Sequence, residues 1–374
     1  MKIKYLSASV LPSSAANSVH VMHMCEGLRQ LGHDVTLVGT IPPATDEVQH
    51  EGQLFDYYGV TERFAIKRVS RPNIKYLGLI IYSLLSVVCH VYGSGADLVY
   101  CRDYLGALLS ARSRFRTIFE LHEMPVSFVS RHCFKLLAAS AFLERVVVIS
   151  DALKIDLLKI YPRLEHKVIV AHDAARDTPE STVALTAAIG RLQVGYTGGL
   201  YKGKGVELVA EIARAMPLMD FHVVGGTGEV LDRWRIATDD LDNLTFHGHV
   251  PRSQVPAYVA SFDVVLLPNQ RVVYGKAVRA DIGRWTSPLK MFEYMASEQT
   301  IVCSDLPVLK EILSDDVNCL LCDPESLDDW VNALAKLEAD PGLRARLACR
   351  AREDFLLHHT WAKRAEKILV CVEN

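Results

Sequence analysis

Short apolar runs alternate with helical patterns along the first half of the chain. Apolar residues recur at helical spacing from Val19 to Leu31, and further helices are expected over 131–144 and 151–160. Between these helices, β-branched residues form short apolar runs that are typical of strands buried on both faces. This alternation predicts a parallel sheet covered by helices on both sides. The expected strands are 3–7, 35–39, 97–101, 117–121, 145–149 and 167–170.

The same alternation restarts after a polar stretch. Residues 174–190 contain Asp, Thr, Pro, Glu, Ser and Ala, a composition typical of a linker. Because 374 residues suffice for two domains, we expect two open α/β domains, 1–175 and 191–357, joined by a linker over 176–190. The tail over 341–372 is expected to be helical throughout. The strands expected in the second domain are 192–196, 221–224, 244–246, 264–267, 300–303 and 318–321.

Charge and cysteine content narrow the class of protein. The chain has 41 basic and 44 acidic residues, without the excess of Lys and Arg that a nucleic-acid partner would need. Nine Cys, an odd number, favour buried thiols in a reducing, cytoplasmic setting over a disulfide framework. Cys319 and Cys322 have metal or redox spacing, but the residues between them are apolar and no second pair follows. A structural strand is therefore the favoured interpretation of that segment.

Two apolar segments could be mistaken for membrane signals. Residues 1–16 are similar to a weak signal peptide, but Lys4 and two Ser interrupt the apolar part, which favours a first strand. Residues 76–92 fall short of the about 20 needed to cross a bilayer, which favours a buried helix. The basic residues before this helix suit either an anionic bilayer surface or a solvated loop. These residues are Arg63, Lys67, Arg68, Arg71 and Lys75.

The stretch after residue 286 has the pattern of an anion-binding helix start. Ser287 fits the N-cap and Pro288 the first helical position, and free backbone N–H groups there can bind phosphate. Lys290 adds a positive charge in the first turn. Glu293 follows on the same side of the helix, where its carboxylate could accept two ribose hydroxyls. A capped helix with a surface Lys290–Glu293 pair fits the spacing equally well.

Glycine-rich turns follow two strands of the second domain. The segment 194–205 reads as a strand, a glycine turn and a helix, in which Lys202 and Lys204 could reach phosphate oxygens. The alternative is a glycine turn with solvated lysines. The segment 223–228 partly matches a dinucleotide fingerprint with the wrong spacing, and a tight strand-to-helix turn explains it equally well. The glycines concerned are Gly198, Gly199, Gly203, Gly225 and Gly226.

A long loop and two strand ends add further candidates. The loop 268–286 is long for a compact domain and carries four basic residues that could attract a diphosphate or be solvated. In the first domain, His122 and Glu123 follow one predicted strand, and Arg102 and Asp103 follow its neighbour. Ligands bind beyond the carboxyl ends of parallel strands, so these side chains are candidate site residues. The basic loop residues are Arg271, Lys276, Arg279 and Arg284.

Together these motifs resemble the GT-B glycosyltransferases, specifically the large retaining family 4. The resemblance covers nearly the whole chain. It includes Gly-His-Asp-Val at 32–35, Glu-Leu-His-Glu at 120–123, Val-Ile-Ser at 148–150, Gly-Lys-Gly at 203–205, Ser-Pro-Leu-Lys-Met-Phe-Glu-Tyr-Met-Ala at 287–296 and Ser-Asp-Leu-Pro at 304–307.

The resemblance implies two Rossmann-like domains facing each other across a deep cleft. The C-terminal domain would hold a nucleoside-diphosphate sugar and the N-terminal domain a saccharide or lipid-linked acceptor. The last helix, about 358–374, would pack back on the N-terminal domain. No metal or other cofactor is expected, because lysines and a helix start would take its role. The product would belong to polysaccharide or glycoconjugate biosynthesis, in the cytoplasm or at the inner face of the plasma membrane.

The resemblance also implies roles for individual residues. Glu293 would hold the ribose, and His122 would sit beside the transferred sugar. Catalytic roles fall to His122, Lys204 and Glu293, and acceptor binding falls to Arg102, Asp103 and Glu123. The residues placed at the nucleotide sugar are Asn17, Ser18, Gly198, Gly199, Lys202, Gly203, Gly225, Gly226, Ser287, Pro288, Leu289, Lys290 and Glu293.

The sequence departs from the family pattern at three places. Trp285 stands where the family often has a Glu that contacts the donor sugar, so the donor is left open. Gly199 stands where an Arg is common, and Asn17–Ser18 replace a Gly-Gly pair. A sugar-nucleotide epimerase or phosphorylase of the same fold, or a non-catalytic binding module, are the alternatives to a transferase.

Overall fold

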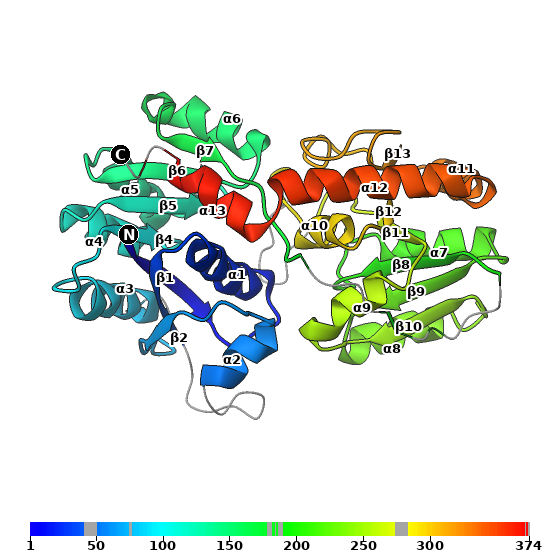
Figure 1. The fold of residues 1–374 in the computed structure, drawn as a ribbon, viewed down its shortest axis with the longest axis horizontal. Helices are drawn as coiled ribbons and strands as arrows, with labels where there is room; N and C mark the ends of the chain where they lie inside the picture. The colour runs from blue at the N-terminus through cyan, green and yellow to red at the C-terminus, as the bar shows by residue number, and fades with distance from the viewer. Residues whose placement is uncertain are drawn as a thin grey trace. The chain divides into compact units, whose positions relative to one another are not determined.

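A computed structural model describes residues 1–40, 51–74, 77–177, 182, 183, 185, 190–273, 283–370 and 372 (Figure 1). The chain forms two compact units, Met1–Asp173 with Trp361–Asn374, and Ala174–Thr360. The backbone therefore passes from one unit to the other twice. Each unit is a parallel sheet with helices, which confirms the predicted class of two Rossmann-like α/β domains.

The sheet of the first unit has seven parallel strands in the order β3-β2-β1-β4-β5-β6-β7 among the described residues. The strand order reverses between β1 and β4, which leaves a crevice at their carboxyl ends. The strands are β1 Lys2–Val10, β2 Asp34–Thr40, β3 Ala65–Arg68, β4 Leu98–Cys101, β5 Thr117–Leu121, β6 Leu143–Val148 and β7 Val168–Val170. The helices are α1 Ala16–Gln30, α2 Glu51–Tyr58, α3 Leu77–His90, α4 Tyr104–Arg112, α5 Phe128–Ala138, α6 Asp151–Ile160, the 3₁₀ turn η1 Pro162–Leu164, and α13 Trp361–Leu369.

As far as the structure describes it, the second unit repeats this plan with six parallel strands in the order β10-β9-β8-β11-β12-β13. Here the order reverses between β8 and β11. The strands are β8 Gln193–Thr197, β9 Asp220–Val224, β10 Leu244–Gly248, β11 Val264–Leu267, β12 Thr300–Ser304 and β13 Leu320–Cys322. The helices are α7 Val206–Ala215, α8 Gly228–Ala237, η2 Arg252–Gln254, α9 Val255–Val259, α10 Leu289–Ala296, α11 Leu327–Ala339 and α12 Pro341–His358.

Several predicted helix limits were wrong. Helix α1 begins at Ala16, three residues before the expected start at Val19, so Asn17 and Ser18 lie in its first turn, and the Ser18 hydroxyl donates to the Val10 carbonyl (3.1 Å). Helix α5 ends at Ala138, and Glu144 belongs to strand β6. The predicted continuous tail is two helices, because the chain breaks at 359–360 where it passes between the units.

The last helix packs on the first unit as the resemblance implied. Helix α13 lies beside α1 in Figure 1, and both belong to the same compact unit. The contact requires a glycine, because a Cβ at Gly27 would lie 2.5 Å from the Trp361 carbonyl oxygen. The backbones of α1 and α13 therefore touch directly, and α13 is an integral part of the first unit.

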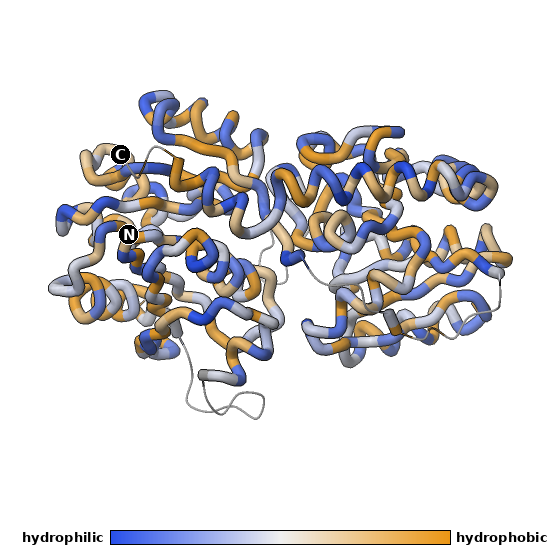
Figure 2. The backbone as a smooth tube through the Cα atoms, viewed as in Figure 1, coloured by the Kyte–Doolittle hydropathy of each residue, from blue (hydrophilic) through white to orange (hydrophobic). Residues whose placement is uncertain are grey.

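Helix α3 is less buried than the sequence predicts. Its inner face packs Tyr82 and Val87, but Leu84 and Val88 on the outer face are 44% and 59% exposed. Figure 2 shows how apolar this helix is along its length. Among the described residues, no helix combines the length and the apolar character needed to span a bilayer. Residues 2–10 form β1, a central strand, as predicted.

Candidate functional site

A buried ammonium group without a hydrogen-bond partner marks the site in the second unit. Lys290 lies in the first turn of α10, and its Nζ makes no hydrogen bond to any described residue. It lies 4.0 Å from the centre of the Tyr196 ring. A cation–π contact is worth about 0.5–2 kcal/mol, less than full hydration of an ammonium. The site is therefore built for an anion that the folded chain does not itself supply.

A second lysine strengthens this positive field. Burial lowers the pKa of Lys204, and burial together with the charge of Lys204 holds the pKa of Lys290 well below its usual value. Two ammonium groups that repel each other and are both partly dehydrated favour binding of a multiply charged anion. Lys202, two residues earlier, is exposed, so water and salt screen its charge more than that of Lys204.

Glycines let the two turns after β8 and β9 approach each other and Lys290. A Cβ at Gly225 would lie 2.0 Å from the Gly198 carbonyl oxygen, and one at Gly198 would lie 3.7 Å from Lys290 Nζ. Gly203 has φ +87° and a Cβ there would overlap the Val272 carbonyl at 2.2 Å. The close backbone contact of these turns explains the glycines and brings three predicted segments to one place.

The helix start itself differs slightly from the prediction. Pro288 occupies the N-cap of α10 and buried Ser287 precedes it, so Ser287 is not the capping residue. The reason is that Pro288 adopts extended backbone angles, which makes Leu289 the first helical residue. The first-turn amides of such a helix remain donors for an anion.

Glu293 forms an ion pair with Arg252, and the predicted surface pair with Lys290 is wrong. The Arg252 guanidinium contacts Glu293 Oε1, and the side chain of Glu293 is 18% exposed. Arg252 lies in η2, just after the carboxyl end of β10. This arginine is not among the residues predicted from the sequence, although its place after a strand end was an available signal.

The structure describes only part of the basic loop. Arg271 makes ion pairs with Asp323 and Glu325, both at 3.2 Å, so its charge is already partnered. Lys276 and Arg279 lie outside the described residues. The cysteine segment is structural as predicted, because burial raises the pKa of the Cys322 thiol to about 12, the opposite of a metal or redox thiolate.

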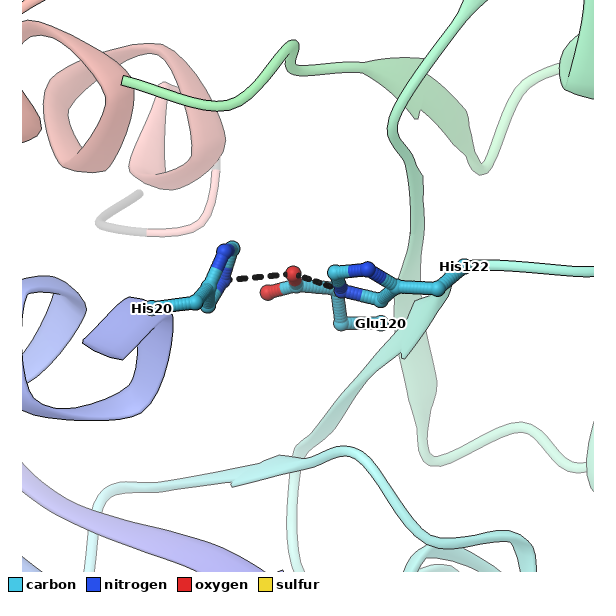
Figure 3. Close-up of side chains that lie close together, drawn as sticks. All are labelled: His20, Glu120 and His122. Atoms are coloured by element: carbon cyan, nitrogen blue, oxygen red, sulfur yellow. Dashed lines mark hydrogen bonds and ion pairs between the residues drawn. The ribbon is translucent and has the colours of Figure 1, made fainter. Parts of the chain in front are cut away.

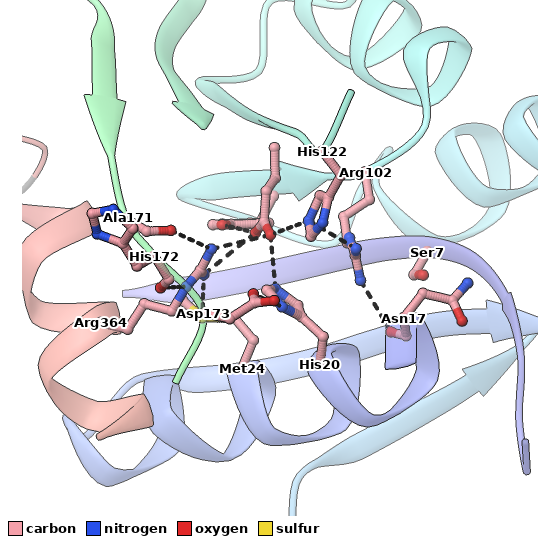
Figure 4. A network of polar contacts seen from close by, with 12 residues as sticks. Ser7, Asn17, His20, Met24, Arg102, His122, Ala171, His172, Asp173 and Arg364 are labelled. Atoms are coloured by element: carbon pink, nitrogen blue, oxygen red, sulfur yellow. Dashed lines mark hydrogen bonds and ion pairs between the residues drawn. The ribbon is translucent and has the colours of Figure 1, made fainter. Parts of the chain in front are cut away.

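The first unit brings three sequence-predicted residues together at the ends of its strands. His122 Nε2 lies 2.8 Å from Arg102 Nη2, and Arg102 Nη1 donates to the Asn17 carbonyl at 3.0 Å. Their strands, β4 and β5, lie next to the reversal of strand order. The His122 side chain is 29% exposed, so the ring can meet a ligand. Figure 4 shows this network and the groups behind it.

Burial keeps the His122 ring neutral. Burial and the positive charge of Arg102 outweigh the opposing effect of Glu120 and lower the pKa of His122 to about 4. At neutral pH the ring therefore acts as a hydrogen-bond donor or acceptor and not as a cation.

Glu120, absent from the predicted site, is the centre of the polar cluster behind His122 (Figure 3). Its carboxylate Oε1 lies 2.6 Å from His122 Nε2 and 2.7 Å from His20 Nε2. This spacing would allow the three side chains to share a metal ion. The Arg364 guanidinium already lies 3.2 Å from the same oxygen, so we assign no metal to this cluster.

The predicted acceptor residues differ in their surroundings. Asp103 is buried and caps α4, accepting from the Gly106 amide at 2.6 Å and from the Ser83 hydroxyl at 2.8 Å. Burial raises the pKa of Asp103. These hydrogen bonds give Asp103 a structural role at the start of α4, and acceptor binding by Asp103 stays a prediction. Acceptor binding by Arg102 and exposed Glu123 stays a prediction.

Comparison with known proteins agrees with this arrangement. A family model described as Glycosyltransferase Family 4 matches residues 18–176, and one described as Glycosyl transferase-like matches residues 204–370. A D-inositol 3-phosphate glycosyltransferase of Xylanimonas cellulosilytica is 30% identical over 111 residues. That match covers 30% of this chain and only 24% of the relative.

Solved glycosyltransferase structures share the fold along the whole chain. Sucrose-phosphate synthase from Thermosynechococcus elongatus superposes with a TM-score of 0.73 at 17% identity, covering 100% of this chain and 98% of that one. Anabaena Alr3699/HepE, solved with UDP and glucose, gives 0.72 at 16% identity and covers 100% of both chains. Such low identities establish the fold alone. The chain thus has the two-domain GT-B fold of these structures, and each of its two domains matches a glycosyltransferase family model.

Proposed function

We propose that the protein is a retaining glycosyltransferase that uses a nucleoside-diphosphate sugar and a saccharide or lipid-linked acceptor. The observation that carries the proposal is the buried Lys290 ammonium, unpartnered among the described residues, beside Lys204 and the glycine turns. A pyrophosphate is the anion of matching charge. The similar HepE structure, which holds UDP and glucose, supports a nucleotide-sugar donor.

The proposed reaction follows from where negative charge develops. The bond between the sugar C1 and the diphosphate oxygen breaks, and Lys204, Lys290 and the α10 amides stabilise the leaving diphosphate. The acceptor hydroxyl forms the new C1–O bond from the leaving-group side, and its proton passes to a diphosphate oxygen. The Glu293 carboxylate, paired with Arg252, accepts hydrogen bonds from the ribose hydroxyls. His122 forms a hydrogen bond with the transferred sugar. These steps need no metal, since the two ammonium groups carry the compensating charge.

Thermal unfolding in the presence of nucleotides tests the diphosphate site. At 100 times Kd a ligand adds about 2.7 kcal/mol, which for units of this size raises Tm by roughly 5–10 °C. We expect at least one nucleoside diphosphate to give such a shift, its monophosphate to give less, and the free nucleoside to give almost none. Failure of UDP, GDP, ADP, CDP and TDP alike would contradict the proposal.

We also propose that the outer face of α3 contacts an anionic membrane surface bearing the acceptor. Leu84, Val88 and neighbouring apolar side chains are exposed there, and Lys67 and Arg68 are exposed on the nearby edge strand β3. Apolar side chains flanked by basic ones match the interface of an anionic bilayer.

Flotation with phosphatidylglycerol vesicles tests this contact. The wild type should float, and Leu84→Asp/Val88→Asp and Lys67→Glu/Arg68→Glu should each reduce flotation several-fold. Leu357→Asp, at a comparably exposed position on α12, is the matched control and should float like the wild type. Equal flotation of all four proteins would contradict the proposal.

A further inference from the structure

Helix α13 places a guanidinium in the interior of the first unit. The Arg364 side chain is only 2% exposed. Its Nε donates to the His172 carbonyl at 2.9 Å, and Nη2 donates to the Ala171 carbonyl at 3.1 Å. The carboxylate it contacts is Glu120, with Nη2 at 3.2 Å from Oε1. Figure 4 shows Arg364 reaching from α13 toward the group of polar side chains behind His122.

The charge of Arg364 determines the state of Glu120. Burial would by itself raise the pKa of this carboxyl group, but Arg364 and His20, with hydrogen bonds from His122 and His20, hold it well below its usual range. The Tyr100 hydroxyl also donates to Glu120 Oε2. Glu120 is therefore an ionised carboxylate, and an ionised carboxylate can only accept hydrogen bonds.

This state has a consequence for the neighbouring imidazole. His122 Nε2 lies 2.6 Å from Glu120 Oε1 and 2.8 Å from Arg102 Nη2, and one ring nitrogen cannot donate to the first and accept from the second. If Nε2 carried no hydrogen, two lone pairs would face each other at the shorter contact. The hydrogen is therefore on Nε2, which donates to the ionised Glu120, while Arg102 keeps its hydrogen bond to the Asn17 carbonyl. A neutral ring protonated on Nε2 has an unprotonated Nδ1, which is then free to accept a hydrogen bond. A protonated Glu120 would instead donate to Nε2 and move the ring hydrogen to Nδ1.

We propose that Arg364 is a positioning residue which, through the Glu120 carboxylate, fixes the orientation and tautomer of His122. The ring then presents Nδ1 as an acceptor for a hydroxyl of the bound sugar or acceptor. The inference rests on the proposed function in assuming that His122 meets the substrate. The C-terminal helix thus does more than close the fold, because it sets the chemistry of a residue more than 200 positions earlier in the chain.

Other titratable and charged groups surround the same cluster. Removal of Arg364 would leave the Glu120 carboxylate with less positive charge around it, so the pKa of His122, which faces this carboxylate, should rise. The groups that face Glu120 and His122 are His20 from α1, Tyr5 from β1, Tyr100 and Arg102 from β4 and its end, and Asp173 after β7.

Nitrogen NMR of the full chain labelled with ¹⁵N-histidine tests the proposal, with His122→Gln used for assignment. In the wild type we expect the Nε2–H tautomer of His122 and no protonation above about pH 5, one unit above its lowered pKa. In Arg364→Met the tautomers should mix and the midpoint of protonation should rise by at least one pH unit. Arg364→Lys should restore most of the wild-type spectrum.

Kinetics give the second readout. Arg364→Met should lower kcat at least 10-fold with little change in the KM of the donor, and Arg364→Lys should recover part of this loss. Arg350→Met, an exposed arginine on α12, controls for the substitution itself. A folded Arg364→Met protein with the wild-type tautomer, midpoint or kcat would overturn the proposal.

A second variant covers the case in which Arg364→Met does not fold, and nucleotide binding tests the proposed function separately. If Arg364→Met does not fold, the double variant Arg364→Met/Glu120→Gln removes both charges together. This variant should fold and should lose the fixed His122 tautomer. A wild-type spectrum in the double variant would overturn the proposal. Failure of the proposed function would be seen separately, because the wild type would then bind no nucleotide while the NMR comparison remained valid.

Discussion

Replacing Lys290 with methionine should lower sugar transfer by about 10²–10³-fold while the fold stays intact. Removal of one preorganised group that stabilises developing negative charge typically costs this much in kcat. Methionine keeps an apolar stem against Tyr196 and removes only the charge. Because the ammonium is dehydrated and repelled by Lys204, Tm of the ligand-free protein should not fall and should rise slightly. Steady-state release of nucleoside diphosphate from the donor measures the first effect.

Lys202→Met is the matched control for this substitution. Lys202 lies on the same glycine turn as Lys204 but is exposed, so its loss should change transfer less than about 5-fold. Full activity in both Lys290→Met and Lys204→Met would refute the assignment of the pyrophosphate site.

The pH dependence of the same lysine has a definite sign. A lowered pKa means that Lys290 loses its proton at a pH below that of a free lysine. In the ligand-free protein, stability should therefore increase as pH rises through this pKa, while affinity for the nucleoside diphosphate should fall. Titration calorimetry between pH 7 and pH 10 measures the affinity. Lys290→Met should remove most of this pH dependence.

The buried strands were the most predictable part of the fold. Strands such as β4 and β11 carry only apolar residues and are buried along their whole length because both faces are covered. Strand β3 escaped prediction, since it is the edge strand and only one of its four residues is buried. The residue pattern stays helical through 359–360 and does not mark the break between α12 and α13, although the family resemblance implied a separate last helix from about 358.

The candidate site was predictable only where chemistry and local sequence coincide. Lys290, Lys204 and Gly198 stand in glycine turns or a helix start, which are recognisable locally, and the parallel topology brings them together. Arg252 has only its place after a strand end as a local signal, and Arg364 has none. Their partners lie 41 and 244 positions away in the chain, so only the folded structure identifies these pairs.

Removal of the Glu120 carboxylate should be the most destabilising single change in the first unit. Glu120→Ala leaves the Arg364 guanidinium and two imidazoles without their shared acceptor in a buried place. Loss of one partner of a buried ion pair costs about 3–5 kcal/mol. Urea denaturation at pH 7, followed by a probe in the first unit, should show a loss of that size for Glu120→Ala.

The contribution of Glu120 to stability should depend on pH with a definite sign. A carboxyl group with a lowered pKa stabilises the fold above its unfolded pKa of about 4.3, and this stability is lost only as pH falls through the lower folded pKa. The difference in unfolding free energy between wild type and Glu120→Gln should therefore stay constant from pH 8 to pH 5.5 and shrink only in stronger acid.

Glu123→Ala, three positions away and exposed, should change the free energy of unfolding by less than about 0.5 kcal/mol. Glu120→Met/Arg364→Met should recover much of the loss, because a neutral pair leaves no uncompensated charge. If Glu120→Ala proved as stable as Glu123→Ala, Glu120 would not be the charged centre of this unit.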